Sequence, residues 1–202
     1  MNRYIASILF VVAACVVGIV VVGSLSGVGE VPSQPTSAPD PRNATYLIEG
    51  VPVTLVNGRA EMPVAPASAS TIVTQYFGED LQIDLDLDGR MDTAFILTQE
   101  TSGSGTFFYA VAALNTERGY IGSDGYLLGD RIAPQPTTVS PNPTHKGVVV
   151  FNYADRKPSD PMTVRPSEGK SVYLKLDIPS MRWGIVMPDF EGESAYPNSR
   201  VR

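Results

Sequence analysis

Cysteine, histidine and tryptophan are almost missing from this chain, since each occurs once among its 202 residues. The single cysteine, Cys15, excludes an internal disulfide framework. The single histidine, His145, excludes a zinc site built from several imidazoles or thiolates. His145 stands in the turn-rich stretch SPNPTHKG, and we assign it to a surface loop. The composition therefore favours neither a disulfide scaffold nor a zinc enzyme.

Positive charge is also scarce. The chain has 15 Lys and Arg against 21 Asp and Glu, a net charge of -6 and a pI of about 4.7. A protein that binds nucleic acid needs a basic footprint to neutralise phosphates, so we exclude nucleic acid as a partner. No G-x-S-x-G motif is present to display a serine nucleophile. We therefore expect no enzymatic activity.

Helix-favouring stretches are few, because 18 Gly and 17 Pro punctuate the chain, while 43% hydrophobic residues suffice for a core. The predicted fold is mainly β, an antiparallel sheet or sandwich, or α+β if residues 65–74 form one short helix. The strongest turn signal is Asn57-Gly58, which ends a hairpin or meander divided at Gly50. Further strands are predicted at residues 70–77, 93–99, 106–114, 120–128, 138–139, 147–153 and 172–176.

The amino terminus carries the one long apolar run. No charged residue occurs between Tyr4 and Gly29, and residues 5–23 are nearly all apolar. Because a helix of roughly 20 apolar residues spans a bilayer, we predict a transmembrane anchor over residues 4–23, with the lipid bilayer as its partner. Arg3 precedes this segment and few charges follow it, which places the amino terminus in the cytoplasm and the carboxy-terminal domain outside.

Two alternatives to an uncleaved anchor stay open. A signal peptidase could cut near Ser24 or Ser26, where small residues lie. The stretch Val-Ala-Ala-Cys ending at Cys15 has the shape of a lipoprotein box, in which Cys15 would be lipidated. In each case the rest of the chain is exported to the extracytoplasmic side of the cell membrane.

The composition divides the remainder into three parts. Residues 24–43, SLSGVGEVPSQPTSAPDPRN, have little to bury and are typical of an extended tether. Residues 44–177 form the predicted β-rich extracytoplasmic domain. Residues 178–202 form an irregular tail, in which residues 183–187 are a candidate for a last strand.

Carboxylates are concentrated in one short segment. Residues 79–92, EDLQIDLDLDGRMD, contain six acidic residues and one arginine, so they carry nearly all of the excess negative charge. Like charges at every second position repel one another unless a cation neutralises them. A hard cation that takes 6–8 oxygen ligands meets this need. The segment therefore predicts a calcium site.

The spacing of the acidic residues defines the ligands that we predict. In the pattern D-x-D-x-D-G-x-x-D, the side chains of Asp84, Asp86, Asp88 and Asp92 and the backbone carbonyl of Arg90 supply oxygens, and Gly89 takes the sharp turn. Glu79 or Asp80 is a candidate for one more oxygen. The loop is not a full EF-hand, because its twelfth position is Phe95 rather than a bidentate glutamate. A solvated acidic turn without an ion is the alternative.

An aspartate loop that runs directly into the apolar strand TAFILT resembles the calcium loops of FG-GAP and dockerin-like repeats. The resemblance implies a structural calcium with Asp84, Asp86, Asp88 and Asp92 as side-chain ligands. Residues 53–58, 72–78, 103–114, 128–135 and 150–158 resemble a second family, an uncharacterised domain of exported bacterial proteins. Some of its members occur beside a membrane-bound inhibitor of c-type lysozyme. That resemblance covers about residues 46–176 and implies export rather than a mechanism.

A basic patch offers a second candidate for function. Residues 146–175 contain six basic and three acidic residues, opposite in sign to the acidic loop. An envelope component or protein with negative groups is therefore a candidate partner there. We expect a membrane-anchored, extracytoplasmic, calcium-binding domain with a structural or interaction role. The alternative is an exported cell-envelope hydrolase or a protein similar to lysozyme inhibitors.

Overall fold

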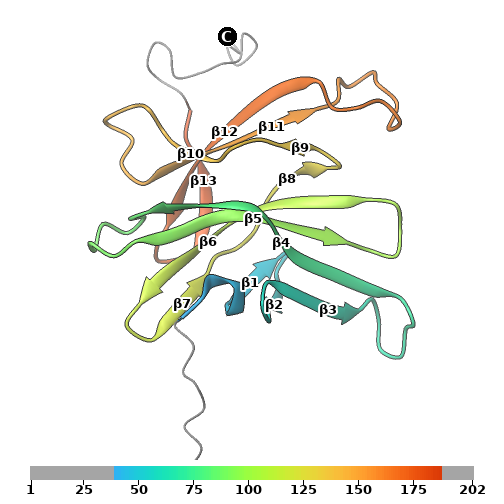
Figure 1. Ribbon diagram of the computed structural model, residues 1–202, viewed down its shortest axis with the longest axis horizontal. Helices are drawn as coiled ribbons and strands as arrows, with labels where there is room; N and C mark the ends of the chain where they lie inside the picture. The colour runs from blue at the N-terminus through green and yellow to red at the C-terminus, as the bar shows by residue number, and fades with distance from the viewer. Residues whose placement is uncertain (1–38, 188–202) are drawn as a thin grey trace, which may run out of the picture. The chain divides into compact units, whose positions relative to one another are not determined.

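The computed structural model describes residues 39–187, which lie within the compact unit Ser37–Arg202. The described residues form antiparallel sheets and one short 3-10 turn, η1 (Pro41–Asn43) (Figure 1). The strands are β1 (Thr45–Ile48), β2 (Val51–Thr54), β3 (Arg59–Pro63), β4 (Thr71–Ile83), β5 (Asp92–Glu100), β6 (Thr106–Thr116), β7 (Gly119–Gly122), β8 (Tyr126–Asp130), β9 (Ala133–Pro134), β10 (Thr138–Val139), β11 (Val148–Asp155), β12 (Glu168–Asp177) and β13 (Arg182–Ile185).

The strands make three sheets. The largest has six strands in the order β3-β4-β5-β6-β7, with β8 also paired to β6. The second has five strands in the order β10-β11-β12-β13, with β9 also paired to β11, and β1 and β2 form a separate hairpin. Every named strand pair is antiparallel. The prediction of a mainly β, antiparallel fold is therefore confirmed.

The middle strands β5 and β6 of the six-stranded sheet are buried on both faces, which is unusual for an antiparallel sheet. In β5, Ala94 and Ile96 belong to one hydrophobic cluster, while Phe95 and Leu97 alternate into another. The first cluster joins this sheet to Val149, Phe151, Leu174 and Leu176 of the five-stranded sheet. The second joins it to the β1–β2 hairpin through Tyr46, Ile48 and Val53. The three sheets therefore stack as layers, with β5 and β6 at the centre.

Two tight turns set the path of the chain from β1 to β3. Glu49 and Gly50 have φ angles of 53° and 79°, and Asn57 and Gly58 have φ angles of 51° and 82°. Two successive residues with positive φ give the turn that matches the twist of paired strands, and Asn-Gly adopts it readily. The hairpin predicted at Gly50 is therefore confirmed, but it does not continue as a meander, because β3 pairs with β4 in another sheet.

The prediction of a short helix at residues 65–74 is wrong. Residues 65–70 form the loop that joins β3 to β4, and the last four residues of the predicted segment begin β4. Turn contacts hold this loop, since the Ser68 N–H donates to the Ala65 carbonyl and the Ser70 N–H to the Ser68 hydroxyl. Serine and proline favour such local hydrogen bonds over a helix. Within residues 39–187 no α-helix is present.

The strand predicted at residues 120–128 is two strands, because Ser123 breaks it. The Ser123 hydroxyl accepts a hydrogen bond from the Ala112 N–H and donates to the Asp124 carbonyl. The folded region also continues beyond Asp177, since β13 pairs with β12 inside the segment assigned to the tail.

Among residues 39–187 no helix is long and apolar enough to cross a membrane, and the predicted anchor lies outside the described residues.

Candidate metal centre

The acidic loop, residues 84–91, joins the ends of β4 and β5 in the six-stranded sheet. Ile83 pairs with Asp92 across the ladder, so residues 84–91 close a hairpin. Leu85 is buried in the core between the two sheets, which anchors the start of the loop. Leu87 and Gly89 have positive φ angles of 62° and 89°. These two left-handed residues curl the loop between its successive aspartates.

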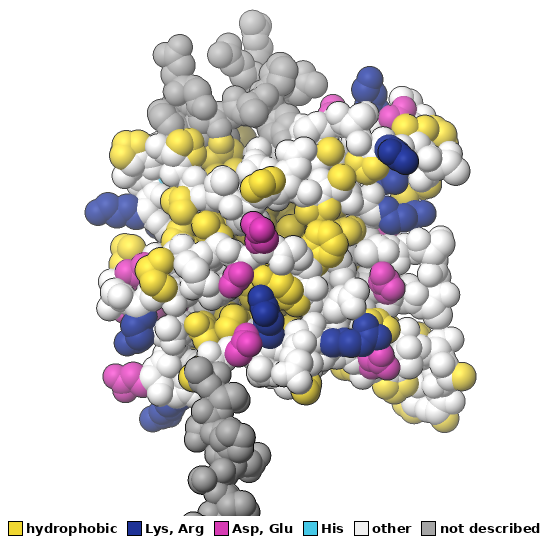
Figure 2. All heavy atoms as spheres, viewed as in Figure 1, with side chains coloured by type: hydrophobic (Ala, Val, Ile, Leu, Met, Phe, Trp, Pro, Cys, Tyr) yellow, Lys and Arg dark blue, Asp and Glu magenta, His cyan; other side chains and the backbone are white. Residues whose placement is uncertain are grey.

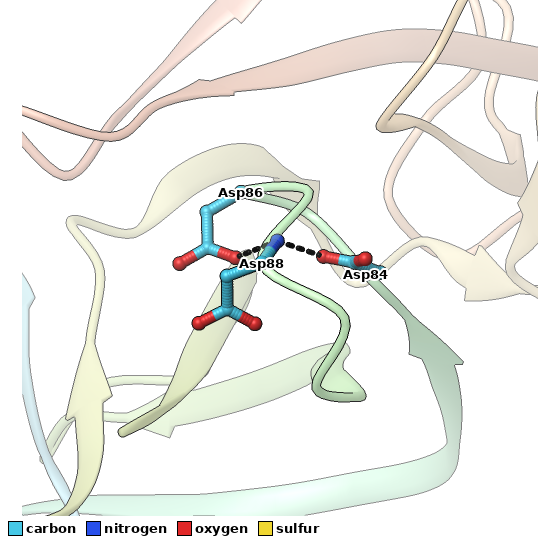
Figure 3. Close-up of side chains that lie close together, drawn as sticks. All are labelled: Asp84, Asp86 and Asp88. Atoms are coloured by element: carbon cyan, nitrogen blue, oxygen red, sulfur yellow. Dashed lines mark hydrogen bonds between the residues drawn. The ribbon is translucent and has the colours of Figure 1, made fainter. Parts of the chain in front are cut away.

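Three carboxylates converge inside this curl. Asp84, Asp86 and Asp88 each offer one oxygen, and these oxygens lie within 4.8 Å of one another. Figure 3 shows the Asp84 and Asp86 carboxylates directed at the same backbone nitrogen, that of Asp88. Two oxygens that bind one calcium ion from opposite sides are about 4.8 Å apart, twice the ordinary calcium–oxygen distance. The cluster could therefore hold a single metal ion.

Backbone N–H groups of the loop direct partial positive charge at these carboxylates. The Asp88 N–H donates to Asp84 Oδ1 and to Asp86 Oδ1, both at 3.1 Å, and the Gly89 N–H donates to Asp84 Oδ2 at 3.0 Å. The Arg90 guanidinium forms an ion pair with Asp88, and Arg90 Nε donates to the Asn115 carbonyl at 2.7 Å. One arginine and partial charges on amides leave the three carboxylates with a net negative charge.

Asp92, the fourth predicted side-chain ligand, lies outside the cluster of three. It is 1% exposed. Its Oδ2 accepts the Leu85 N–H and its Oδ1 accepts the Asn115 N–H, both at 2.8 Å. Burial raises the pKa of the Asp92 carboxyl above its usual value, and the two N–H donors offset part of that rise. Asp92 therefore fastens the acidic loop to β6 across the sheet.

The other residues considered from the sequence lie elsewhere. Asp80 accepts hydrogen bonds from the Tyr76 hydroxyl and the Gln82 amide on β4, and neither Asp80 nor Glu79 belongs to the cluster of three. His145 lies in the loop before β11, with its ring nitrogens 3.2 Å from Ser140 Oγ and from Asn142 Nδ2. Asn115 is the neighbour of the site that sequence reasoning missed, because nothing but the register of β6 places it beside Asp92.

Two members of the basic patch hold the fold together. The Arg156 guanidinium donates to the Val164 and Arg131 carbonyls, and Lys170 Nζ lies 2.7 Å from Asp155 Oδ2. The other four basic residues of the patch form no ion pair within residues 39–187; they are Lys146, Lys157, Arg165 and Lys175. The patch therefore leaves part of its charge for other contacts.

No known family model, curated protein or solved structure matches this chain.

Proposed function

We propose that this chain is a membrane-anchored, extracytoplasmic domain whose acidic loop binds a structural calcium ion, and that it has a structural or interaction role. The observation that carries the proposal is the convergence of Asp84, Asp86 and Asp88 within the span of one ion. Magnesium fits less well, because it prefers fewer protein ligands and keeps its waters. Calcium is also plentiful outside the cytoplasm, where weak affinity suffices.

Five oxygens of the chain are proposed ligands. Asp84, Asp86 and Asp88 supply the three convergent carboxylates, and the Arg90 carbonyl and the Asp92 carboxylate supply the others. Each Asp92 oxygen accepts one hydrogen bond, so each retains a lone pair for a cation. Binding would draw together β4, β5 and, through Asn115, β6. The ion would then stabilise the central sheet rather than take part in a reaction.

Calcium is expected to raise the melting temperature of the purified chain by roughly 3–6 °C. At a millimolar ion concentration and a dissociation constant near 10⁻⁴ M, binding stabilises the folded state by about 1.4 kcal/mol. Circular dichroism during heating, with calcium and then with an excess of chelator, measures the shift. Magnesium at the same concentration should give a smaller one.

Matched substitutions separate this site from a general effect of salt. Asp88→Asn should abolish the calcium-dependent shift, because it removes one charge from the convergent cluster. Glu100→Gln removes an exposed charge at the far end of β5 and should leave the shift unchanged. If the unmodified chain melts at one temperature with calcium and with chelator, the calcium proposal is wrong.

The anchor has its own test. The apolar run at residues 5–23 predicts that the full chain stays in the membrane fraction after washing with alkaline carbonate and is released by detergent. Mass spectrometry of the purified chain then decides between the alternatives. An intact amino terminus supports the anchor, a start near Ser24 or Ser26 supports cleavage, and a modified Cys15 supports lipidation.

A further inference from the structure

An acidic groove lies between the two large sheets, and no residue of the acidic loop lines it. It has a volume of about 370 Å³ and is lined on one side by residues 77–80 of β4 and on the other by Pro134 and residues 135–137, which follow β9. Its apolar surface comes from Phe77, Ile96 and two prolines. The two charged residues of its lining, Glu79 and Asp80, are both acidic.

A bulge in β4 shapes the groove. The pairing of β4 with β5 is interrupted between Phe77 and Leu81, and Gly78 has a φ angle of 76°. Bulges redirect side chains and are frequent beside binding sites. Here Phe77 remains 40% exposed, although its ring packs edge to face on Phe108. Glu79 forms no hydrogen bond or ion pair within the described residues, so its carboxylate is available to a partner.

The loop between β11 and β12 has the complementary character. Met162 and Val164 are 45% and 40% exposed, and the neighbouring Lys157 and Arg165 are exposed cations without an ion pair in residues 39–187. The one acid of this loop, Asp160, accepts the Lys157 N–H. Figure 2 shows lysine and arginine side chains gathered where Figure 1 places this loop.

The loop has a defined shape before it meets any partner. The Arg156 guanidinium donates to the Val164 carbonyl at 2.6 Å, and the Val164 N–H donates to the Pro161 carbonyl at 2.9 Å. Arg156 also donates to the Arg131 carbonyl, which ties the loop to the segment leading into β9. A preformed loop loses less conformational freedom on docking than a flexible one does.

We propose that the acidic groove of one copy of this chain receives the basic β11–β12 loop of a second copy. The aliphatic stems and apolar side chains of the loop would cover Phe77, while Arg165 or Lys157 would pair with Glu79. Because β9 pairs with the end of β11 at Tyr153 and Ala154, the groove and the loop lie close together in one chain. Two copies can therefore exchange these contacts reciprocally about a two-fold axis.

Sedimentation analysis of fragment 37–202 tests the proposal, because this compact unit contains all the described strands and both cores that join the sheets. In chelator, so that calcium plays no part, we expect a dimer that weakens as salt is added. Glu79→Lys and Arg165→Glu should each lower the association constant about tenfold or more. Glu100→Lys alters an exposed charge outside the groove and should leave it within about threefold.

Mixing the two weakened variants provides the decisive measurement. In a pair formed by Glu79→Lys and Arg165→Glu, each groove faces a loop of opposite charge, so association should return to nearly the unmodified level. A fragment that stays monomeric, or an association that the two charge reversals leave unchanged, overturns the proposal. So does a mixture that associates no better than its components. Because both residues are exposed, we expect both variants to keep the fold, and circular dichroism checks this.

Discussion

Replacing Asp92 with alanine is expected to lower the free energy of unfolding by about 3–5 kcal/mol, even in chelator. The Asp92 carboxylate accepts the Leu85 and Asn115 N–H groups, and the alanine side chain has no oxygen to replace it. A buried N–H left without an acceptor costs about 1–3 kcal/mol. Urea unfolding followed by circular dichroism measures the change.

Asp86→Ala is the matched control for this effect. It removes an aspartate from the same loop, but Asp86 accepts a single hydrogen bond, from an N–H that also donates to Asp84. In chelator it should cost less than about 1 kcal/mol. If the two variants unfold at the same urea concentration, the assignment of Asp92 as the residue that holds the loop to β6 is wrong.

Gly122→Ala is expected to cost about 3 kcal/mol, because the new methyl group meets backbone rather than a movable side chain. A Cβ at Gly122 would lie 2.3 Å from the Thr45 carbonyl oxygen and 2.7 Å from Tyr46 Cδ1. Tyr46 is fully buried, with its hydroxyl donating to the Pro41 carbonyl. The methyl group would therefore push the first hairpin away from β7. The same urea titration measures this loss.

Gly103→Ala provides the comparison for Gly122. Gly103 lies in the loop between β5 and β6, and a Cβ there would approach nothing closer than the Thr101 hydroxyl at 3.6 Å. Its substitution should change the free energy of unfolding by no more than about 0.5 kcal/mol. Equal stability of the two variants would contradict the close packing of the first hairpin on β7.

Local patterns in the sequence were sufficient to predict much of the fold. Asn57-Gly58 marked a turn that the structure contains, and the apolar run at residues 93–99 became β5 nearly at the predicted bounds. Strand β3, RAEMP, escaped prediction because Ala, Glu and Pro are disfavoured in strands, although its side chains alternate between exposed and half-buried. The break at Ser123 was also missed, since it depends on a hydrogen bond to Ala112, a residue of another strand.

The candidate metal centre was likewise predictable from the sequence only in part. Asp84, Asp86 and Asp88 lie within one loop, so their spacing predicted that they converge, whereas Asp92, predicted as a fourth side-chain ligand, lies outside this cluster. The surroundings of Asp92 depend on the pairing of β5 with β6, which brings Asn115 to it across 23 positions of the chain. Spacing along the chain carries no information about that contact.

The path of the chain through its two large sheets has a consequence for how an exported protein would acquire its structure. Along the main path of each sheet the strands follow one another in chain order. Each newly emerged strand can therefore pair with the one before it, without waiting for a distant segment, and such local assembly is fast. The opening hairpin is the exception. Its apolar side chains pack on β5 and β6, which are synthesised later. These side chains therefore stay exposed to solvent until the chain has emerged past residue 113.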